Sequence, residues 1–407
     1  MTTWPDMKIG RAARLISGVG FPHEYQGKDS GAVPFLKVSD LNSGNFRQPI
    51  LTAQNWVSHT DLSSLGARLA PAGAIAFPKV GAAMLKNPRR ILGHPAAMDN
   101  NLMAAVPLKG EPRFWLYALS TIDLGEIAAG GVLPYVNEGQ VRDLRIPFPP
   151  PDEQRRIADY LDTEIDSINS LVAKKHQLIT LLNERIDSRV LHHVGASRLV
   201  HPKRGNATLP LRRILDKVMR PPVAGAGIIT AYRDGQVTDR TARRADGYTL
   251  SASTQPQGQH VQVGDVVVHG LDGFAGAIGT AEAQGNCSPV YHVCVPKNLG
   301  DPRFLGRLLR VLALQGYLGN FATSTRERAV DFRNWDLFGR IPIPVVAPVE
   351  QREIGEWISK VRPLREAIEK SAVLAAERRQ SLITAAVTGQ FDVSTASGRN
   401  VTEGVSA

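Results

Sequence analysis

Two stretches of the sequence nearly repeat each other: IPFPPPDEQRRI at residues 146–157 and IPIPVVAPVEQREI at residues 341–354. Five residues of the first stretch recur, each 197 positions later: Pro151, Glu153, Gln154, Arg155 and Ile157 return as Pro348, Glu350, Gln351, Arg352 and Ile354. An internal repeat of this kind determines the architecture of a chain.

Further matches flank the two stretches in the same order. Upstream, GEPRF at 110–114 matches GDPRF at 300–304, AAVP at 104–107 matches VCVP at 293–296, and 73–77 matches 264–268. Downstream, apolar positions correspond: Ile165, Ile168, Val172, Leu178 and Ile186 meet Val361, Leu364, Ile368, Leu374 and Leu382. The sequence therefore predicts a duplicated unit of about 190–200 residues.

The first part of each copy holds short apolar runs separated by Gly, Pro, Asn and Asp, as in 35–38, 73–77, 261–268 and 290–295. That pattern is typical of many short strands with a few helices, here expected at 114–128 and 304–322. We predict an α+β fold with two globular domains of this kind, over residues 1–150 and 205–346.

The second part of each copy is predicted to be a long helix, over residues 151–195 and 347–391. Pro151 and Pro348 suit a first helical turn, and no Gly or Pro occurs from 152 to 194. Gly355 and Pro363 predict a kink or a restart in the second helix. Apolar residues at steps of three and four predict an antiparallel coiled-coil pair separating the domains, with seam and partner-interface positions at Ile165, Ile168, Val172, Ile179, Leu182, Ile186, Leu364, Ile368 and Leu382. Residues 392–407 are expected to form a disordered tail.

Composition restricts the class of protein. Hydrophobic residues make up 43% of the 407 residues, which excludes wholesale disorder. The formal charge of +10 favours polyanionic partners, nucleic acid before anionic membrane. No apolar run reaches the length of a membrane span, and the first ten residues lack a signal-peptide core.

The cysteines favour a reducing, cytoplasmic location. Only Cys287 and Cys294 occur, which excludes a disulfide framework. His292 lies between them, yet the alternating apolar residues around it indicate a strand with small buried thiols rather than a metal site. We therefore expect no metal and no cofactor.

The repeated Ile-Pro-x-Pro stretch, the Glu-Gln-Arg-x-Ile sequence and the long seam-bearing helix together resemble the specificity subunit of type I restriction–modification systems. The resemblance runs from about Lys8 to Phe391 and is strongest at 151–157 and 348–354. It implies two target-recognition domains held apart by two antiparallel helices with pseudo-twofold symmetry. It also implies that each domain reads one half of a bipartite DNA site, while the helices set the gap.

The resemblance further implies partners: double-stranded DNA, two modification (methyltransferase) subunits that dock on the helices, and restriction (motor-nuclease) subunits. The Pro363 position and the Ala-rich seam around Ala372 and Ala375 depart from the usual regular helix.

Catalytic motifs are absent from the sequence. An Asn/Asp-Pro-Pro-aromatic motif is approached only by Asn87-Pro88-Arg89-Arg90, which lacks the second proline and the aromatic residue. The phosphate-binding sequence of ATP-driven motors and the zinc motifs do not occur. We therefore expect a chain that binds DNA while its partners catalyse.

Basic residues on expected loops are the candidate DNA contacts, because Lys and Arg bind phosphates and Arg, Asn and Gln read base edges. In the first domain the candidates are Lys37, Lys79, Lys86, Arg89, Arg90 and Asn101. In the second domain they are Arg233, Arg240, Arg243, Arg244, Arg326, Arg328 and Arg333. Residues 86–90 are expected to form an exposed basic loop, and the Glu-Gln pairs are expected to hold the helix starts against their domains.

Two other functions remain open from the sequence. One is a self-contained DNA methyltransferase or nuclease with unrecognised motifs, and the other is a coiled-coil scaffold for protein partners. Methyl transfer by the purified chain would distinguish the first, and indifference of DNA binding to loss of the arginines would distinguish the second.

Overall fold

The computed structural model describes residues 4–42, 46–128, 133–194, 208–243, 258–321 and 331–393. The chain divides into two compact units, one of residues 1–173 and 372–407 and the other of residues 174–371. Each long helix therefore contributes one half to each unit. Of the tail expected at 392–407, residues 394–407 lie outside the described residues.

The first unit is built around a four-stranded antiparallel sheet, in the order β2 (Ala13–Ser17), β8 (Leu102–Pro107), β5 (Ile75–Pro78) and β6 (Arg90–Ile91). Alternate side chains of β8 enter two different cores. Met103 and Ala105 belong to one core, and Leu102, Ala104 and Val106 belong to the other. Because successive residues of a strand point to opposite faces, a sheet covered on both faces needs the continuous apolar run seen in the sequence.

Smaller sheets and short helices complete the first unit. β3 (Val33–Leu36) pairs antiparallel with β4 (Trp56–Val57) and parallel with β7 (Ala97–Met98), and β1 (Asp6–Lys8) pairs with β9 (Arg145–Pro147). The helices are α1 (Ile9–Ala12), α2 (Val38–Leu41), α3 (His59–Ser64), α4 (Ala82–Leu85), α5 (Pro112–Ser120), α6 (Leu124–Ile127) and α7 (Glu138–Asp143), with a 3-10 turn η1 (His23–Tyr25).

The single helix predicted at 114–128 is wrong, because the chain forms α5 and α6 instead. The hydroxyls of Ser120 and Thr121 donate to the carbonyls of Tyr117 and Ala118 at the end of α5. Asp123 then caps the start of α6 by accepting from the backbone N–H of Gly125 at 2.7 Å. Side chains that bond to nearby backbone in this way end one helix and begin the next.

The second unit repeats this plan. Its four-stranded antiparallel sheet has the order β11 (Leu215–Val218), β18 (Tyr291–Pro296), β15 (Val266–His269) and β16 (Ile278–Thr280). The repeated segments 104–107 and 293–296 lie in β8 and β18, which hold the same place in the two sheets. The duplication predicted from the sequence is therefore confirmed at the level of topology.

The remaining elements of the second unit are three two-stranded pairs and short helices. The pairs are β10 (Thr208–Pro210) with β19 (Pro342–Pro344), β12 (Ile229–Ala231) with β13 (Val237–Asp239), and β14 (Gln259–Val261) with β17 (Gly285–Cys287). The helices are α10 (Leu211–Ile214), α11 (Pro302–Leu314) and α12 (Trp335–Phe338), with 3-10 turns η2 (Arg240–Ala242), η3 (Gly273–Ala275) and η4 (Leu318–Phe321). The helix expected at 304–322 thus ends at Leu314 and is followed by a separate turn.

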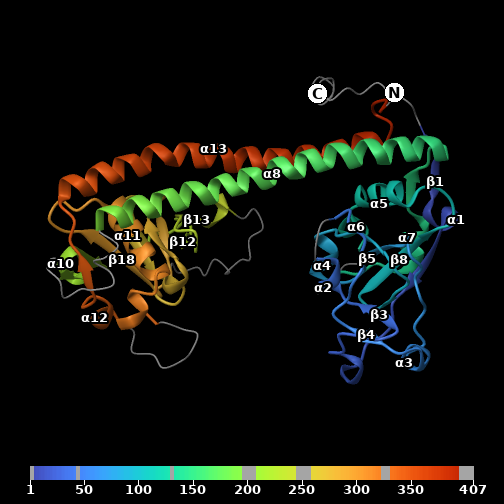
Figure 1. Ribbon diagram of the computed structural model, residues 1–407, viewed down its shortest axis with the longest axis horizontal. Coiled ribbons are helices and arrows are strands. Elements are labelled where there is room, and N and C mark those ends of the chain that lie inside the picture. The colour runs from blue at the N-terminus through green and yellow to red at the C-terminus, as the bar shows by residue number, and fades with distance from the viewer. Residues whose placement is uncertain are drawn as a thin grey trace. The chain divides into compact units, whose positions relative to one another are not determined.

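The two long helices are α8 (Pro151–Val194) and α13 (Pro348–Val387), which begin at the predicted prolines (Figure 1). They run antiparallel in each unit. In the second unit Lys175 of α8 donates to Ser371 of α13, and Arg189 of α8 stacks over Trp357 of α13. Residue numbers therefore decrease along α13 in the direction in which they increase along α8. In the first unit Tyr160 contacts Phe391 and Arg379 donates to Asn169. The α+β architecture with long antiparallel helices is confirmed.

The helix pair differs from the expectation in two respects. α13 is continuous through Pro363, so the predicted restart is wrong. Leu364 is 52% exposed and therefore lies outside the seam. The other seam positions are buried or half-buried: Ile165, Ile186, Ile368 and Leu382 are buried, and Ile168, Val172, Ile179 and Leu182 are half-buried.

Candidate nucleic-acid interface and its support

Each long helix starts against its own globular domain through a buried glutamine. Gln154 Oε1 accepts from the backbone N–H of Glu111 at 3.0 Å, and its Nε2 donates to the Pro149 carbonyl at 2.8 Å. Gln351 does the same in the second unit, accepting from Asp301 N–H at 3.2 Å and donating to the Val346 carbonyl at 2.7 Å. The repeated glutamines therefore join each helix to its domain, as the sequence predicted.

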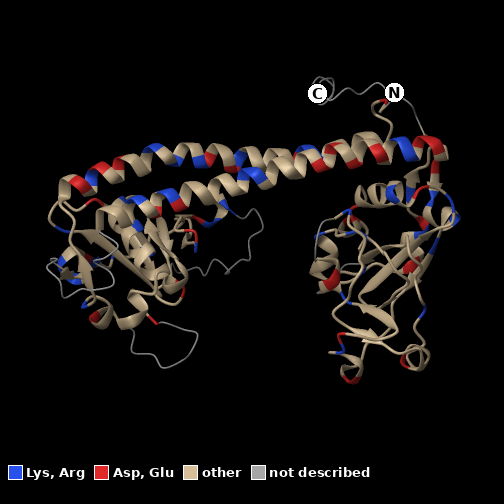
Figure 2. Cartoon of the chain, in the orientation of Figure 1, with Lys and Arg blue, Asp and Glu red and all other residues tan. Residues whose placement is uncertain are grey.

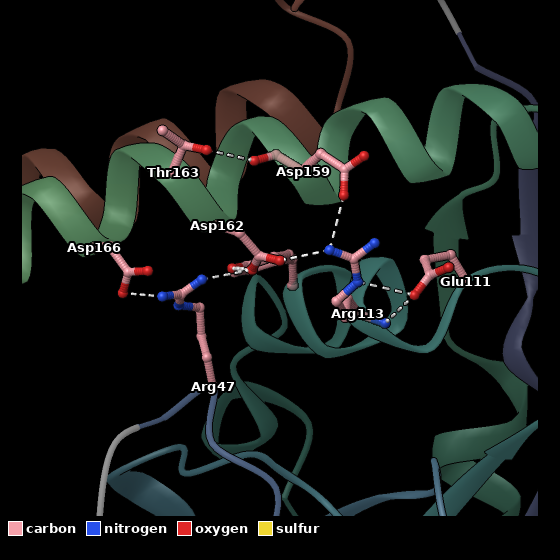
Figure 3. Close-up of polar contacts among 8 residues, drawn as sticks. Arg47, Glu111, Arg113, Asp159, Asp162, Thr163 and Asp166 are labelled. Atoms are coloured by element: carbon pink, nitrogen blue, oxygen red, sulfur yellow. Dashed lines mark hydrogen bonds and ion pairs between the residues drawn. The ribbon is translucent and has the colours of Figure 1, made fainter.

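Asp162 of α8 is the centre of a second junction in the first unit (Figure 3). Its Oδ1 accepts from Tyr117 Oη at 2.6 Å and lies 2.8 Å from Arg47 Nη1. Its Oδ2 accepts from Arg113 Nη1 at 2.7 Å. Burial acts to raise the pKa of Asp162, but the hydrogen bonds from Tyr117, Arg47 and Arg113 outweigh burial and hold that pKa below its usual value.

Neighbouring carboxylates extend this junction. Arg47 also contacts Asp166, and Arg113 contacts Asp159 at 2.8 Å and Glu111 at 3.1 Å (Figure 3). The two arginines lie in different parts of the first domain, so α8 is bonded to that domain at two separate places. The junction faces the interior, since the side chains of Arg47 and Asp162 are only 15% and 24% exposed.

The second unit uses different groups at the corresponding positions. Arg303, the repeat counterpart of Arg113, donates to Ser359 Oγ at 2.9 Å on α13. Arg307 and Arg310 of α11 instead contact Asp187 of α8, at 2.5 Å and 3.2 Å. The ionic junction of the second domain is thus made with α8 as well as with its own following helix.

Three of the predicted contacts in the first domain lie around one buried carboxylate, Asp99. The amide and backbone N–H of Asn101 donate to Asp99 at 3.2 Å and 3.0 Å. Lys37 and Lys79 both interact electrostatically with Asp99. Burial lowers the pKa of Lys79, and the negative charges of the nearby Glu138 and Asp99 offset part of this decrease. The structure therefore brings together residues far apart in the sequence, and Asn100 beside them is exposed.

The exposed basic loop predicted at 86–90 is wrong for two of its residues. Arg89 is buried, donates to the carbonyls of Pro88 and Ile122, and lies 5.1 Å from the Phe77 ring centre. Burial lowers the pKa of Arg89 to about 9. Arg90 is buried as well and donates to the Gln48 and Leu41 carbonyls. Both guanidinium groups satisfy backbone acceptors of the domain interior, and only Lys86 stays exposed.

Three of the arginines predicted to contact DNA in the second domain, Arg233, Arg243 and Arg333, lie at the surface beside carboxylates. Arg243 stacks over the Tyr232 ring at 4.3 Å and pairs with Asp234, and Arg233 pairs with Asp272 at 2.9 Å. Arg333 is held by Asp331. A single carboxylate occupies only part of the five donors of a guanidinium, so these groups keep N–H groups for a further acceptor.

Arg240 begins η2 and is half-exposed, close in sequence to Arg243. Arg244, Arg326 and Arg328 lie outside the described residues.

The long helices carry charges of both signs along their length (Figure 2). Four of the nine seam positions predicted for partner binding are buried within this chain, namely Ile165, Ile186, Ile368 and Leu382, and two of them, Ile165 and Leu382, pack into the core of the first unit. Other apolar side chains on the helices are exposed instead, namely Leu171, Val373 and Leu374 in the first unit and Leu178, Leu181 and Leu364 in the second.

The described residues hold no group of three or more His, Cys, Asp or Glu side chains suited to a metal ion. Cys287 and Cys294 are buried in β17 and β18, and burial raises the pKa of Cys287 to about 12. Among the helices that the structure describes, none combines the length and apolar character that a membrane span requires.

The sequence did not single out Arg47 and Asp162. Arg113 belongs to the repeated GEPRF and GDPRF segments, and that repetition is the signal in the sequence that points to it. Arg47 follows the undescribed residues 43–45 and has no counterpart in the second copy that the repeat would reveal.

Comparisons with known proteins agree with this arrangement. Residues 1–181 match the family described as the type I restriction modification DNA specificity domain. The type I restriction enzyme EcoDI specificity subunit of Escherichia coli is 31% identical over 75 residues, which cover 18% of this chain and 17% of that subunit. The chain thus spans about a sixth of the curated relative it matches.

A solved structure from a type I system shares the fold of this chain. A chain from a study titled "Structural basis underlying complex assembly and conformational transition of the type I R-M system" has a TM-score of 0.55 and 15% identity, covering 96% of this chain and 99% of that one. This likeness shows the fold. The S subunit of a type I restriction-modification system from M. genitalium has a TM-score of 0.42 and 16% identity, covering 94% and 96%. Residues 1–181 therefore match a type I restriction modification DNA specificity domain, and the resemblance of the chain to the specificity subunits of type I restriction–modification systems is confirmed.

Proposed function

We propose that this chain is the DNA sequence-recognition subunit of a type I restriction–modification complex. Each globular domain reads one half of a bipartite site in double-stranded DNA, and the long helices fix the spacing between the halves. The chain has no catalytic role, and partner methyltransferase and motor-nuclease subunits carry out the chemistry in the cytoplasm.

The duplication is the observation that carries this proposal. Two sheets of the same strand order, each followed by a long helix bonded through Gln154 or Gln351, give one chain two equivalent reading modules. The first module lies within the matched specificity domain. A bipartite DNA site requires two DNA-reading domains that are joined to each other. The two similar domains and the long helices of this chain favour such an arrangement.

Candidate DNA contacts of the proposal are the basic and amide residues that the structure leaves at or near the surface. They are Lys37, Lys79, Lys86 and Asn101 in the first domain and Arg233, Arg240, Arg243 and Arg333 in the second. Arg244, Arg326 and Arg328 stay predictions from the sequence alone. Arg89 and Arg90 are withdrawn because their guanidinium groups are buried.

The helices are proposed to dock two methyltransferase subunits through their exposed apolar residues. In the second unit Leu178, Leu181 and Leu364 are each between 43% and 52% exposed. Apolar side chains on an amphipathic helix favour a partner that can cover them.

Methylome sequencing tests the proposal directly. A host carrying the complete system is compared with the same host lacking this chain. We expect a split motif, with two short half-sites and a fixed unspecified gap, that is methylated only when the chain is present. Methylation that does not depend on the chain, or a motif without a gap, would falsify the proposal.

The competing enzyme hypothesis has its own test. The purified chain is incubated with DNA and a labelled methyl donor, with and without the methyltransferase subunit. We expect label in DNA only when the methyltransferase is added. Transfer by the chain alone would support a self-contained methyltransferase instead.

A further inference from the structure

We propose that Asp162 is a positioning residue that fixes the orientation of the first DNA-reading domain on α8 and thereby restricts the complex to one gap length. The inference rests on the proposed function, because a gap length has meaning only for a bipartite reader. It concerns a single carboxylate and its three donors, Arg47, Arg113 and Tyr117.

The geometry of Asp162 restrains rotation as well as position. Both carboxylate oxygens are used: Oδ1 by Tyr117 at 2.6 Å and Arg47 at 2.8 Å, and Oδ2 by Arg113 at 2.7 Å. The donors come from α5 and from the loop that follows α2, so the carboxylate is fastened to two separate parts of the domain. Two such attachments prevent the domain from turning about either one.

Apolar packing alone does not provide this restraint. Ile157, Leu161 and Ile165 of α8 are buried in the core that they share with α5. Burial of apolar surface is non-directional, so it holds the domain against the helix but permits small rotations. Hydrogen bonds weaken steeply when misaligned, and those to charged groups are the strongest. The Asp162 junction is therefore the directional part of the attachment.

The geometry of DNA sets how stiff the junction between the first domain and α8 must be. One base pair more or fewer in the gap displaces the second half-site by about 3.4 Å along the axis and rotates it by roughly 35°. A reading domain that rocked on its helix by a comparable amount would accept neighbouring gap lengths. Selecting one gap therefore requires a junction that is stiff on this scale.

Comparison of the two units indicates that a carboxylate at this position is not needed for the fold. The repeat places Ser359 of α13 where Asp162 stands in α8, and Arg303 reaches it with one hydrogen bond of 2.9 Å. In the second domain the ion pairs are made by Arg307 and Arg310 with Asp187 of α8 instead. The two domains thus have different, separately adjustable junctions.

The experiment is methylome sequencing of the complete system carrying Asp162→Asn, which keeps the size of the side chain and removes its charge. Loss of a hydrogen bond to a charged group is worth roughly ten-fold or more in an equilibrium. We expect the same two half-sites to become methylated also at gaps one base pair longer or shorter, about ten-fold or more above wild type. Asp152→Asn, at a site 90% exposed on the same helix, is the matched control and should keep one gap.

Tyr117→Phe provides a second variant, which removes one of the three donors and keeps the ring. If Asp162→Asn fails to fold, as judged by its unfolding transition, Tyr117→Phe decides the matter and should relax the gap to a smaller extent. An unchanged single gap in the folded variants would overturn the inference, and so would altered bases within a half-site. If the wild-type chain itself gives no split motif, the proposed function fails rather than this inference.

Discussion

At the scale of single residues, the glutamine and the glutamate at the start of each long helix have different roles. Gln154 is buried and satisfies one backbone donor and one backbone acceptor, whereas Glu153 lies beside it near the positive end of the helix. A buried amide that serves two backbone groups cannot be replaced by an apolar residue without leaving both groups unsatisfied.

Gln154→Ala is therefore expected to destabilise the chain by at least about 2 kcal/mol, since each of the two unsatisfied backbone groups costs roughly 1–3 kcal/mol. Gln351→Ala should have a similar effect on the second unit. Urea unfolding followed by circular dichroism measures the change, with the exposed Gln380→Ala as control. Equal stability of Gln154→Ala and the control would contradict the assigned role.

The two thiols give a prediction of their own. Burial raises the pKa of Cys287 to about 12, and Cys294 is buried in the neighbouring strand β18 with its pKa also raised. Because the thiolate is the reactive form, neither group should react with a thiol reagent in the folded chain at pH 7.5. Both should react once urea unfolds the protein. Rapid labelling of the native chain would show that these strands open readily.

At the scale of elements, Gly355 explains how α13 approaches its domain. A Cβ at this position would lie 2.3 Å from Asp301 Oδ1. Asp301 caps the start of α11 by accepting from the backbone N–H groups of Arg303 and Phe304. The glycine that the sequence marked as a helix breaker therefore permits close contact between a cap and the helix, and α13 remains continuous.

Gly355→Ala tests this account because helix propensity alone predicts the opposite sign. Alanine favours a helix interior by about 1 kcal/mol over glycine. Overpacking against the Asp301 carboxylate costs typically about 1–3 kcal/mol and breaks the cap as well. We expect a lower unfolding midpoint than wild type, with the exposed Ser381→Ala in the same helix nearly unchanged. A higher midpoint would show that the cap can shift at little cost.

The sequence predicted elements better than contacts. Strands with continuous apolar runs and helices beginning at Pro151 and Pro348 follow from local pattern, and the structure contains them. The exposure of Arg89 and Arg90 could not be predicted, because Arg90 donates to carbonyls of residues 41 and 48, far away in the chain. The spacing of Leu364 matched the predicted seam, yet its side chain is exposed, whereas Val361 and Arg365 beside it are half-buried.

At the scale of the whole molecule, the same sheet topology occurs in both units, but the exposed residues of the two domains differ. The sheet order and the glutamine junctions are the same in both units, whereas the candidate DNA-contacting residues of the two domains do not correspond. Asp99 gathers Lys37, Lys79 and Asn101 in the first domain. In the second domain, arginines stand beside single carboxylates at the surface. If the sheet and helix of each unit are duplicated while the exposed residues differ, the two domains would recognise half-sites of different DNA sequence.

The net charge of +10 leads to a final prediction, on the salt dependence of DNA binding. Binding that releases counterions weakens linearly on a log–log plot against salt, with a slope that falls by about 1 for each lost phosphate contact. The triple variant Arg233→Ala, Arg240→Ala and Arg243→Ala should lower the slope by about 2–3. Fluorescence anisotropy with a duplex, between low and moderate salt, measures the slope.

Arg155→Ala is the matched control, since this side chain is 63% exposed at the start of α8 and away from the reading surfaces proposed here. It should leave the slope unchanged. If the triple variant also kept the wild-type slope, Asp234 and Asp272 would be engaging Arg243 and Arg233 fully, and the second domain would have to contact DNA through other residues. A reduced slope with unchanged folding would instead place phosphates at this surface, because neutralising arginines elsewhere would not alter the number of counterions released.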